Sequence, residues 1–95
     1  MVMDPVELEG RRAQLSAQVD QLRQAVADLA ASYAALPESG LIIDTVGVGA
    51  LTTPGYCVAG AREVLEEALI ELDAAGDAMD RAARYTGRLR GVVFD

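Results

Sequence analysis

The residues that could do chemistry in this 95-residue chain are mainly carboxylates. Acids stand four positions apart at Glu63/Glu67, Glu67/Glu71 and Asp73/Asp77. This spacing places both members of a pair on one face of a helix. Carboxylates on bundle helices can hold two metal ions, but that arrangement also uses a Glu-x-x-His motif. Since the chain contains no histidine, we interpret these acids as a solvated helix face and predict no metal site.

The nucleophilic side chains also lack the groups that would activate them. Ser16, Ser32 and Ser39 have no histidine to act as a general base. Residues 47–52 (GVGALT) lack the third glycine and the lysine of a phosphate-binding loop. Cys57 is the only cysteine, so no intramolecular disulfide can form, and we interpret it as a small loop residue. We therefore predict that the protein is not an enzyme and binds no cofactor.

The charge of the chain bounds its partners and its location. The formal net charge is −7, and all the basic residues are arginines. Because basic side chains supply most of the affinity for phosphates, we expect no binding to nucleic acid. The same charge argues against an anionic membrane surface. No basic leader and no long apolar run are visible in the sequence, so we expect a cytoplasmic protein, or one secreted without a cleaved signal peptide.

A seven-residue apolar repeat predicts a long first helix. Leucine recurs at every seventh position, and mostly β-branched residues fill the positions between, as in a coiled coil. Asp4 is a good N-cap, Pro5 suits the first helical position, and Pro37 ends the pattern. We therefore predict a helix over residues 5–36. Its contacts with the second helix or with a partner are predicted at Leu8, Leu15, Val19, Leu22, Val26, Leu29, Tyr33 and Leu36.

A second helix is predicted over residues 58–90, with an apolar stripe that alternates large and small side chains. One row of this stripe holds leucine and methionine, and the other holds only alanine, which lets a neighbouring helix approach closely. Acids gather in the first half of this helix and arginines in its last turns, which suits the helix dipole. Its predicted interface residues are Leu65, Leu69, Ile70, Leu72 and Met79.

Charge predicts how the two helices pair. An antiparallel hairpin brings the acidic first ten residues beside the arginines of residues 81–90, whereas parallel helices would bring acids beside acids. A lone hairpin buries only one seam and leaves apolar side chains such as Ile70 in water. We therefore predict an all-α, coiled-coil-like two-helix hairpin that dimerises, with itself or with another hairpin, into a four-helix bundle. The alternative is that these are scattered surface residues, which are common.

The predicted join, residues 37–57, is apolar, rich in glycine and longer than a tight turn. Joins of this length are uncommon inside compact domains and are often functional. It could be a loop that packs over the hairpin tip, a segment that contacts a partner, or a membrane-contacting tip. The acidic second helix argues against the membrane, and we favour the partner contact. The candidate recognition residues are Leu41, Ile42, Ile43, Val46, Val48 and Leu51, and residues 91–95 form a short tail.

The overall plan resembles a known family. Two helical arms, residues 3–36 (MDPVELEG…AAL) and 61–89 (AREVLEEAL…GRL), in an acidic chain of about a hundred residues, are similar to the WXG-motif hairpins exported by type VII secretion. The EspC-like branch, whose members often lack the tryptophan, is closer still. Abundant alanine and the absence of lysine are typical of a GC-rich, actinobacterial genome. The resemblance implies a non-enzymatic interaction protein, and the alternative is a cytosolic regulatory coiled-coil adaptor or antitoxin-like protein.

Overall fold

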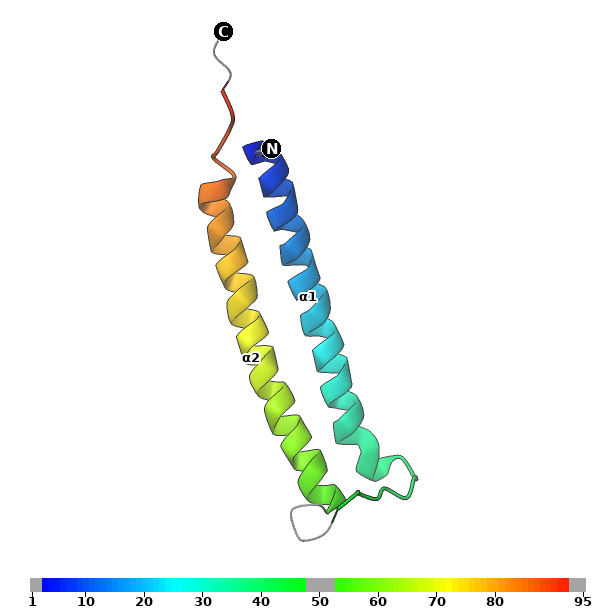
Figure 1. Cartoon of the computed structure of the whole chain (residues 1–95). Helices are drawn as coiled ribbons and strands as arrows, with labels where there is room; N and C mark the ends of the chain where they lie inside the picture. The colour runs from blue at the N-terminus through cyan, green and yellow to red at the C-terminus, as the bar shows by residue number, and fades with distance from the viewer. Residues whose placement is uncertain (1–2, 48–52, 93–95) are drawn as a thin grey trace.

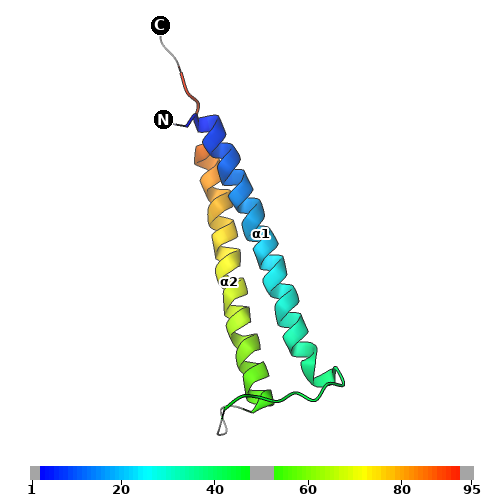
Figure 2. The ribbon, with the colours of Figure 1, turned by 45° about the vertical axis from the view of Figure 1, so that its right-hand side comes forward.

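The computed structural model describes residues 3–47 and 53–92, and two long helices account for most of them. Helix α1 (Pro5–Ala35) is followed by a short 3-10 turn, η1 (Leu36–Glu38), and by helix α2 (Pro54–Thr86). The two helices lie side by side and antiparallel, with the two chain ends together at one end (Figures 1 and 2). This arrangement confirms the predicted all-α hairpin. We call the end with the chain termini the open end and the end with the join the tip.

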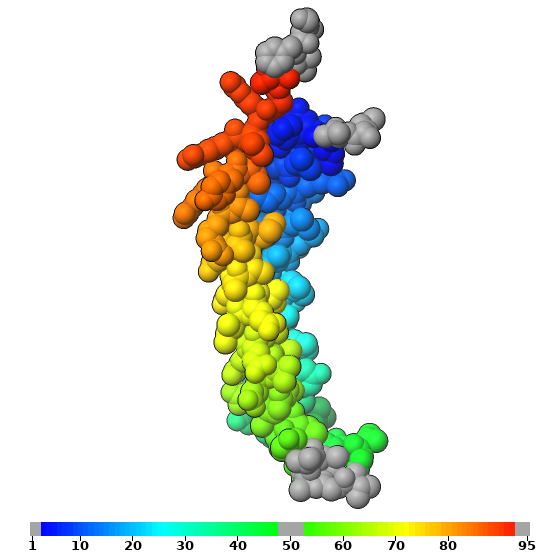
Figure 3. Space-filling view, turned by 60° about the vertical axis from the view of Figure 1, so that its left-hand side comes forward, coloured from blue at the N-terminus to red at the C-terminus, as the bar shows by residue number. Residues whose placement is uncertain are grey.

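The hairpin is a thin rod with a large surface. It measures 73 × 23 × 21 Å, and its radius of gyration is 21.0 Å, whereas a compact domain of this length would have about 12 Å. Figure 3 shows the rod from another side, with α2 along its length. The chain exposes 7675 Å², while a compact protein of its mass exposes about 5,200 Å². About 2,400 Å² of surface is therefore exposed beyond what a compact fold would leave.

The first helix begins at Pro5 as predicted and ends at Ala35, one residue before the predicted end. The carboxylate of Asp4 accepts a hydrogen bond of 2.7 Å from the backbone N–H of Val6, and Pro5 occupies the first helical position. At the other end Pro37 has no N–H to continue the helical hydrogen bonds. The chain therefore tightens into the 3-10 turn, which the backbone N–H of Ser39 closes by donating to the carbonyl of Leu36 at 3.1 Å.

The second helix starts and stops earlier than the predicted range of 58–90. It begins at Pro54 because the hydroxyl of Thr53 caps it, accepting from the backbone N–H of Tyr56 at 3.3 Å. It ends at Thr86, where the backbone N–H of Gly87 donates to the carbonyl of Ala83 at 3.0 Å. The join between helices is correspondingly shorter than predicted at its second end.

The helices meet along a narrow seam that encloses no core. Within the described residues none is buried, and most of the partly buried ones recur every three or four positions on each helix, with a gap in α1 between Val19 and Val26. In α1 these are Pro5, Glu9, Arg12, Ser16, Val19, Val26, Ala27, Ala30 and Ala34. In α2 they are Pro54, Val58, Gly60, Ala61, Leu65, Ala68, Leu69, Leu72, Gly76, Met79, Ala82, Ala83 and Thr86. The seam therefore combines leucine, methionine and small side chains of α2 with valine, small and polar side chains of α1.

The middle of the seam is thinnest at Gly76, and this position offers a test of the helix spacing. A Cβ atom there would lie 3.9 Å from Cγ1 of Val19, an ordinary van der Waals distance. We expect Gly76→Ala to raise the free energy of unfolding by about 0.5–1 kcal/mol, because alanine favours a helix interior over glycine. Urea unfolding followed by circular dichroism measures the change.

The matched control for this substitution is Gly10→Ala. A Cβ atom at Gly10 meets nothing within 4 Å, so that variant reports helix propensity alone. If Gly76→Ala destabilised the protein while Gly10→Ala stabilised it, the helices would lie closer together in solution than the structure places them.

Candidate interaction surface

The leucine row of α1 lies outside the seam. Leu8, Leu15, Leu22 and Leu29 each keep between 47% and 53% of their surface exposed. Val19 and Val26, from the same predicted stripe, are partly buried in the seam. The predicted stripe is thus divided along its length, with its valine side against α2 and its leucine side facing solvent.

Helix geometry explains this division. Each leucine directly precedes a residue of the seam, as Leu8 precedes Glu9 and Leu15 precedes Ser16. One residue corresponds to a rotation of about 100° around an α-helix. The leucines therefore point to one flank of the hairpin, and they stay there because their spacing of seven follows the seam.

The matching flank of α2 is also largely apolar. The residues that directly precede its seam row include Val64 and Tyr85, which are 63% and 75% exposed. In an antiparallel pair, residues at the same position relative to the seam lie on the same face of the hairpin. The reason is that a two-fold axis perpendicular to the plane of the two helix axes relates the two helices. Leu36 and Cys57, one from each flank, indeed line the same cavity at the tip. We call this surface the leucine face: Leu8, Leu15, Leu22, Leu29, Leu36, Cys57, Val64, Ala78 and Tyr85, with one acid, Glu71, in the same row of α2.

The opposite flank of the hairpin is acidic. Asp20 and Gly76 each follow a seam residue by four positions, on the side away from the leucines. They line a hollow of about 220 Å³ together with Arg23, Leu72, Asp73, Asp77 and Asp80. The Arg23 guanidinium and the Asp73 carboxylate form an ion pair between the helices there. The hairpin therefore presents one apolar and one acidic face.

A polar network joins the helices at the open end. The Arg12 guanidinium pairs with the Glu9 carboxylate at 2.8 Å and donates to the backbone carbonyl of Met79 at 3.2 Å. The Thr86 hydroxyl donates to the other oxygen of Glu9. The hydrogen bonds from Arg12 and then Thr86 lower the pKa of Glu9, and the bond to Glu9 raises the pKa of Arg12. Charged groups thus hold the seam where its apolar content is lowest.

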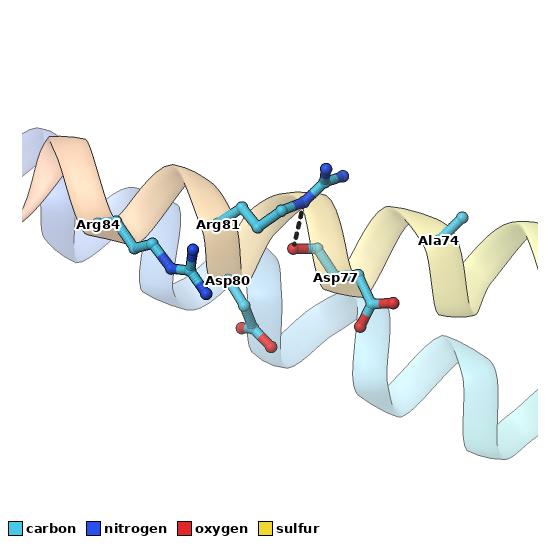
Figure 4. Close-up of a pocket in the computed structure, with 5 residues that line it drawn as sticks. All are labelled: Ala74, Asp77, Asp80, Arg81 and Arg84. Atoms are coloured by element: carbon cyan, nitrogen blue, oxygen red, sulfur yellow. Dashed lines mark hydrogen bonds between the residues drawn. The ribbon is translucent and has the colours of Figure 1, made fainter.

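A hollow of about 550 Å³ lies on the outer side of α2 and is lined mainly by charged residues. Figure 4 shows Arg81 pointing away from α1, while Asp77 and Asp80 point toward the side on which α1 lies. The Arg81 Nε donates to the backbone carbonyl of Asp77 at 3.4 Å. All the lining residues come from one helix, and they are Ala74, Asp77, Asp80, Arg81 and Arg84. We interpret this hollow as a solvated helix surface.

The tip carries the join and a small apolar notch. Ile43 is partly buried and lines a cavity of about 140 Å³ with Pro37, Pro54, Gly55 and Val58. Ile43 therefore anchors the described part of the join against the helices.

The other candidate recognition residues in the described part of the join do not share this anchor. Leu41 is exposed, and the side chains of Ile42 and Val46 are almost wholly in solvent. Val48 and Leu51 lie outside the described residues. The predicted recognition role of the join stays a prediction.

The remaining predicted interface residues divide between the seam and the outer surface. Leu65, Leu69, Leu72 and Met79 are partly buried in the seam, whereas Ile70 is 69% exposed on the outer side of α2. The predicted alanine row of α2 is interrupted in its middle. Ala75 is exposed, and Gly76 takes its place in the seam.

In residues 3–47 and 53–92, no three or more His, Cys, Asp or Glu residues are grouped so that they could hold a metal ion. Neither α1 nor α2, over its described length, is long and apolar enough to cross a membrane.

Comparisons of the chain with protein-family models, with curated proteins and with solved structures found no match. The class of protein is therefore defined by its fold and its exposed surface alone. The chain is an all-α antiparallel hairpin with a half-exposed leucine face on one side.

The open-end network makes part of the stability depend on pH through Glu9. Its pKa lies below the ordinary value of 4.5, so its contribution is fully present above pH 4.5 and is lost as pH falls through the lower, folded-state pKa. We expect Glu9→Gln to be less stable than the native chain at pH 7. This difference should narrow steadily below pH 4.5, as measured by chemical unfolding at several pH values.

The control for this measurement is Glu7→Gln, which removes a carboxylate of the same helical turn outside the network. A difference between Glu9→Gln and the native chain that stayed constant from pH 7 to pH 3 would show that the network is not formed in solution.

Proposed function

We propose that this protein is a non-enzymatic protein–protein interaction module whose leucine face is covered by a partner in a four-helix bundle. The observation that carries this proposal is the row of leucines at regular spacing, each about half exposed, in a hairpin whose described residues include none that is buried. Helices of a bundle contact two neighbours and so carry apolar stripes wider than a single seam needs. The stripe of α1 has this width, and α2 occupies only its valine side.

The energy available at this face is large compared with the marginal stability of a small domain. Fully burying a leucine stabilises by about 1.5–3 kcal/mol, so covering the exposed half of each contributes about 1 kcal/mol. Four leucines in one row then contribute about 4 kcal/mol before the neighbouring Val64 and Tyr85 are considered. A binding partner therefore has enough apolar surface here to form a specific contact.

We further propose that the module is exported by, or associated with, type VII secretion. The support is architectural: two antiparallel helices of 31 and 33 residues joined at one end resemble the WXG-like hairpins in plan. In this hypothesis the helices form the scaffold of the bundle, and the exposed apolar side chains of the join, such as Ile42 and Val46, contact the target.

A cytosolic regulatory adaptor is the second candidate, and specific residues favour it. The join contains no Trp-x-Gly motif, and Tyr85 is followed four residues later by Leu89 where the family's Tyr-x-x-x-Asp/Glu export signal has an acid. In this alternative the leucine face binds an intracellular hairpin or coiled coil, and the protein stays in the cytosol.

Fractionation of the native host, with and without its type VII ATPase, distinguishes the two hypotheses. We expect the chain in the culture medium of the complete strain and its retention in cells that lack the ATPase. Equal retention in the cytosol of both strains would contradict the secretion hypothesis and leave the adaptor hypothesis standing. A cytosolic protein of the same host, probed in parallel, controls for cell lysis.

The interaction itself is tested by changing the leucine face. We expect Leu15→Gln combined with Leu22→Gln to weaken partner binding by about 2 kcal/mol, or roughly 30-fold, since glutamine keeps the helix propensity but not the apolar contact. A tagged chain is recovered from the native host, and light scattering gives the mass of the complex it forms.

The matched control is Ile70→Gln, which removes an exposed apolar side chain from the outer side of α2. The native chain and this control should be recovered in a complex, and the double variant as a 10.0 kDa monomer. A monomeric native chain, or a complex that survives in the double variant, would contradict the proposal.

A further inference from the structure

We propose that Thr86 is a phosphorylation site for a serine/threonine kinase that recognises basic side chains, and that the added phosphate separates the two helices at the open end. The site is indicated by the arginines around Thr86, by the hydrogen bond of its hydroxyl to Glu9, and by the contact of the tail with the start of α1. Thr86 lies in the seam and not on the leucine face, so this site is independent of the proposed interaction surface.

Thr86 stands in the most basic segment of an acidic chain. Residues 81–92 contain four of the eight arginines and no acid, whereas the whole chain has a net charge of −7. Arg84 and Arg88 stand two positions before and two positions after Thr86, and no other serine or threonine has an arginine within two positions. Both arginines are exposed. Since kinases select substrates by charge patterns, exposed arginines on both sides of Thr86 fit a kinase whose substrate groove is acidic.

The backbone around Thr86 can open without unfolding the hairpin. Thr86 is the last residue of α2, and residues 87–92 beyond it are exposed. Two tight turns follow it, in which the N–H of Arg88 donates to the carbonyl of Tyr85 at 3.2 Å and the N–H of Leu89 donates to the carbonyl of Thr86 at 3.3 Å. Turns of this kind have poorer hydrogen-bond geometry than an α-helix, and helix ends fray. Fraying of the last turn therefore exposes the Thr86 hydroxyl to a kinase.

Phosphorylation replaces the proton of the Thr86 hydroxyl by a phosphoryl group. The kinase transfers the γ-phosphoryl group of ATP. The bond from its phosphorus to the bridging oxygen breaks, ADP leaves with the electron pair, and a bond from the phosphorus to the Thr86 oxygen forms. The hydroxyl proton passes to the catalytic base of the kinase. The product carries a charge of about −1.5 to −2 at neutral pH and has no hydroxyl proton left to donate.

The new phosphate stands where Thr86 binds Glu9 in the unmodified chain. The Thr86 hydroxyl donates to one oxygen of the Glu9 carboxylate, and Arg12 binds the other oxygen. These hydrogen bonds keep the pKa of Glu9 below its ordinary value, so the carboxylate is ionised at neutral pH. Phosphorylation removes the hydroxyl donor and places a second anion against the first. The negative end of the α2 dipole adds to this repulsion, because Thr86 is the last residue of the helix.

The tail beyond α2 is displaced together with Thr86. Gly91 lies against the start of α1, where a Cβ atom on Gly91 would be 3.3 Å from Oδ2 of Asp4 and 3.7 Å from Cδ of Pro5. Asp4 and Pro5 form the cap and the first residue of α1. Four residues separate Thr86 from Gly91, so moving Thr86 away from Glu9 also draws the tail from the first turn of α1. The phosphate therefore parts the two ends of the chain.

Labelling of the purified full-length chain tests the site. The chain is incubated with ATP and protein kinase C, an arginine-directed kinase, and peptide mass spectrometry locates the phosphate. We expect phosphate on Thr86, and we expect Arg84→Gln combined with Arg88→Gln to lower its rate of incorporation about tenfold. The control is Arg62→Gln, which removes an exposed arginine far from Thr86. The chain recovered from its native host should carry phosphate on the same residue.

Two results would overturn the site. A purified native chain that takes no phosphate on Thr86, while Glu9→Gln accepts it, would show that the seam protects the hydroxyl. A chain recovered from the native host without phosphate on Thr86 at every stage of growth would show that the residue is not modified in the cell.

Hydrogen exchange tests the opening. In the phosphorylated chain, the amides of residues 6–12 and 80–89 should exchange about tenfold faster, while those of residues 60–75 keep their rates. Thr86→Ala is the matched control, since it removes the hydrogen bond to Glu9 without adding charge. In Glu9→Gln the phosphate should accelerate exchange by less than about threefold, because the repelling carboxylate is absent. Unchanged or slower exchange at the open end of the phosphorylated native chain would contradict the opening.

Discussion

The structure depends on where the backbones of α1 and α2 approach each other most closely. Toward the tip α1 places small side chains in the seam, namely Ala27, Ala30 and Ala34, and near the middle Gly76 of α2 lies against Val19. Small side chains let two helices come together. The leucines of α1 are too large for that close contact, and they lie on one flank of the seam. The side chains that make the closest helix contact are therefore not the ones with the most apolar surface.

This arrangement separates two tasks that one stripe usually performs. The valine side of the α1 stripe and the apolar row of α2 hold the hairpin together, and the leucine side remains available. The polar contacts reinforce the hairpin where apolar contacts are few. Glu9, Arg12 and Thr86 join the helices at the open end, and Arg23 and Asp73 join them near the middle. At the tip, Ile43 and the two prolines that flank the join supply the contact instead.

Much of this fold could be predicted from the sequence because its determinants are local. The leucine repeat and the Asp4–Pro5 start define α1, and the distribution of charge indicates the antiparallel pairing. Helix α2 begins four residues before its predicted start, because its cap precedes the apolar repeat. Thr53 and Pro54 form the same kind of start as Asp4 and Pro5. The end of α2 depends on Gly87, whose amide closes the last turn.

The division of the α1 stripe could not be predicted in the same way. A stripe that holds both leucine and valine rows is wide enough for two neighbours, and its sequence does not say which side each neighbour takes. That choice depends on the small residues of α2, above all Gly76, which stands in the seam where Ala75 was predicted. Which side of the stripe faces α2 is therefore a property of the two helices together, whereas heptad spacing is a property of one helix.

The absence of a buried core among the described residues has a consequence for the life of the protein in a cell. A chain whose every described side chain touches water opens easily, and proteases act on the opened form. Binding of a partner lowers the opened population in proportion to partner concentration. Copies that find no partner would then be degraded first, so the amount of this protein would be matched to the amount of whatever covers it, without any regulation of its synthesis.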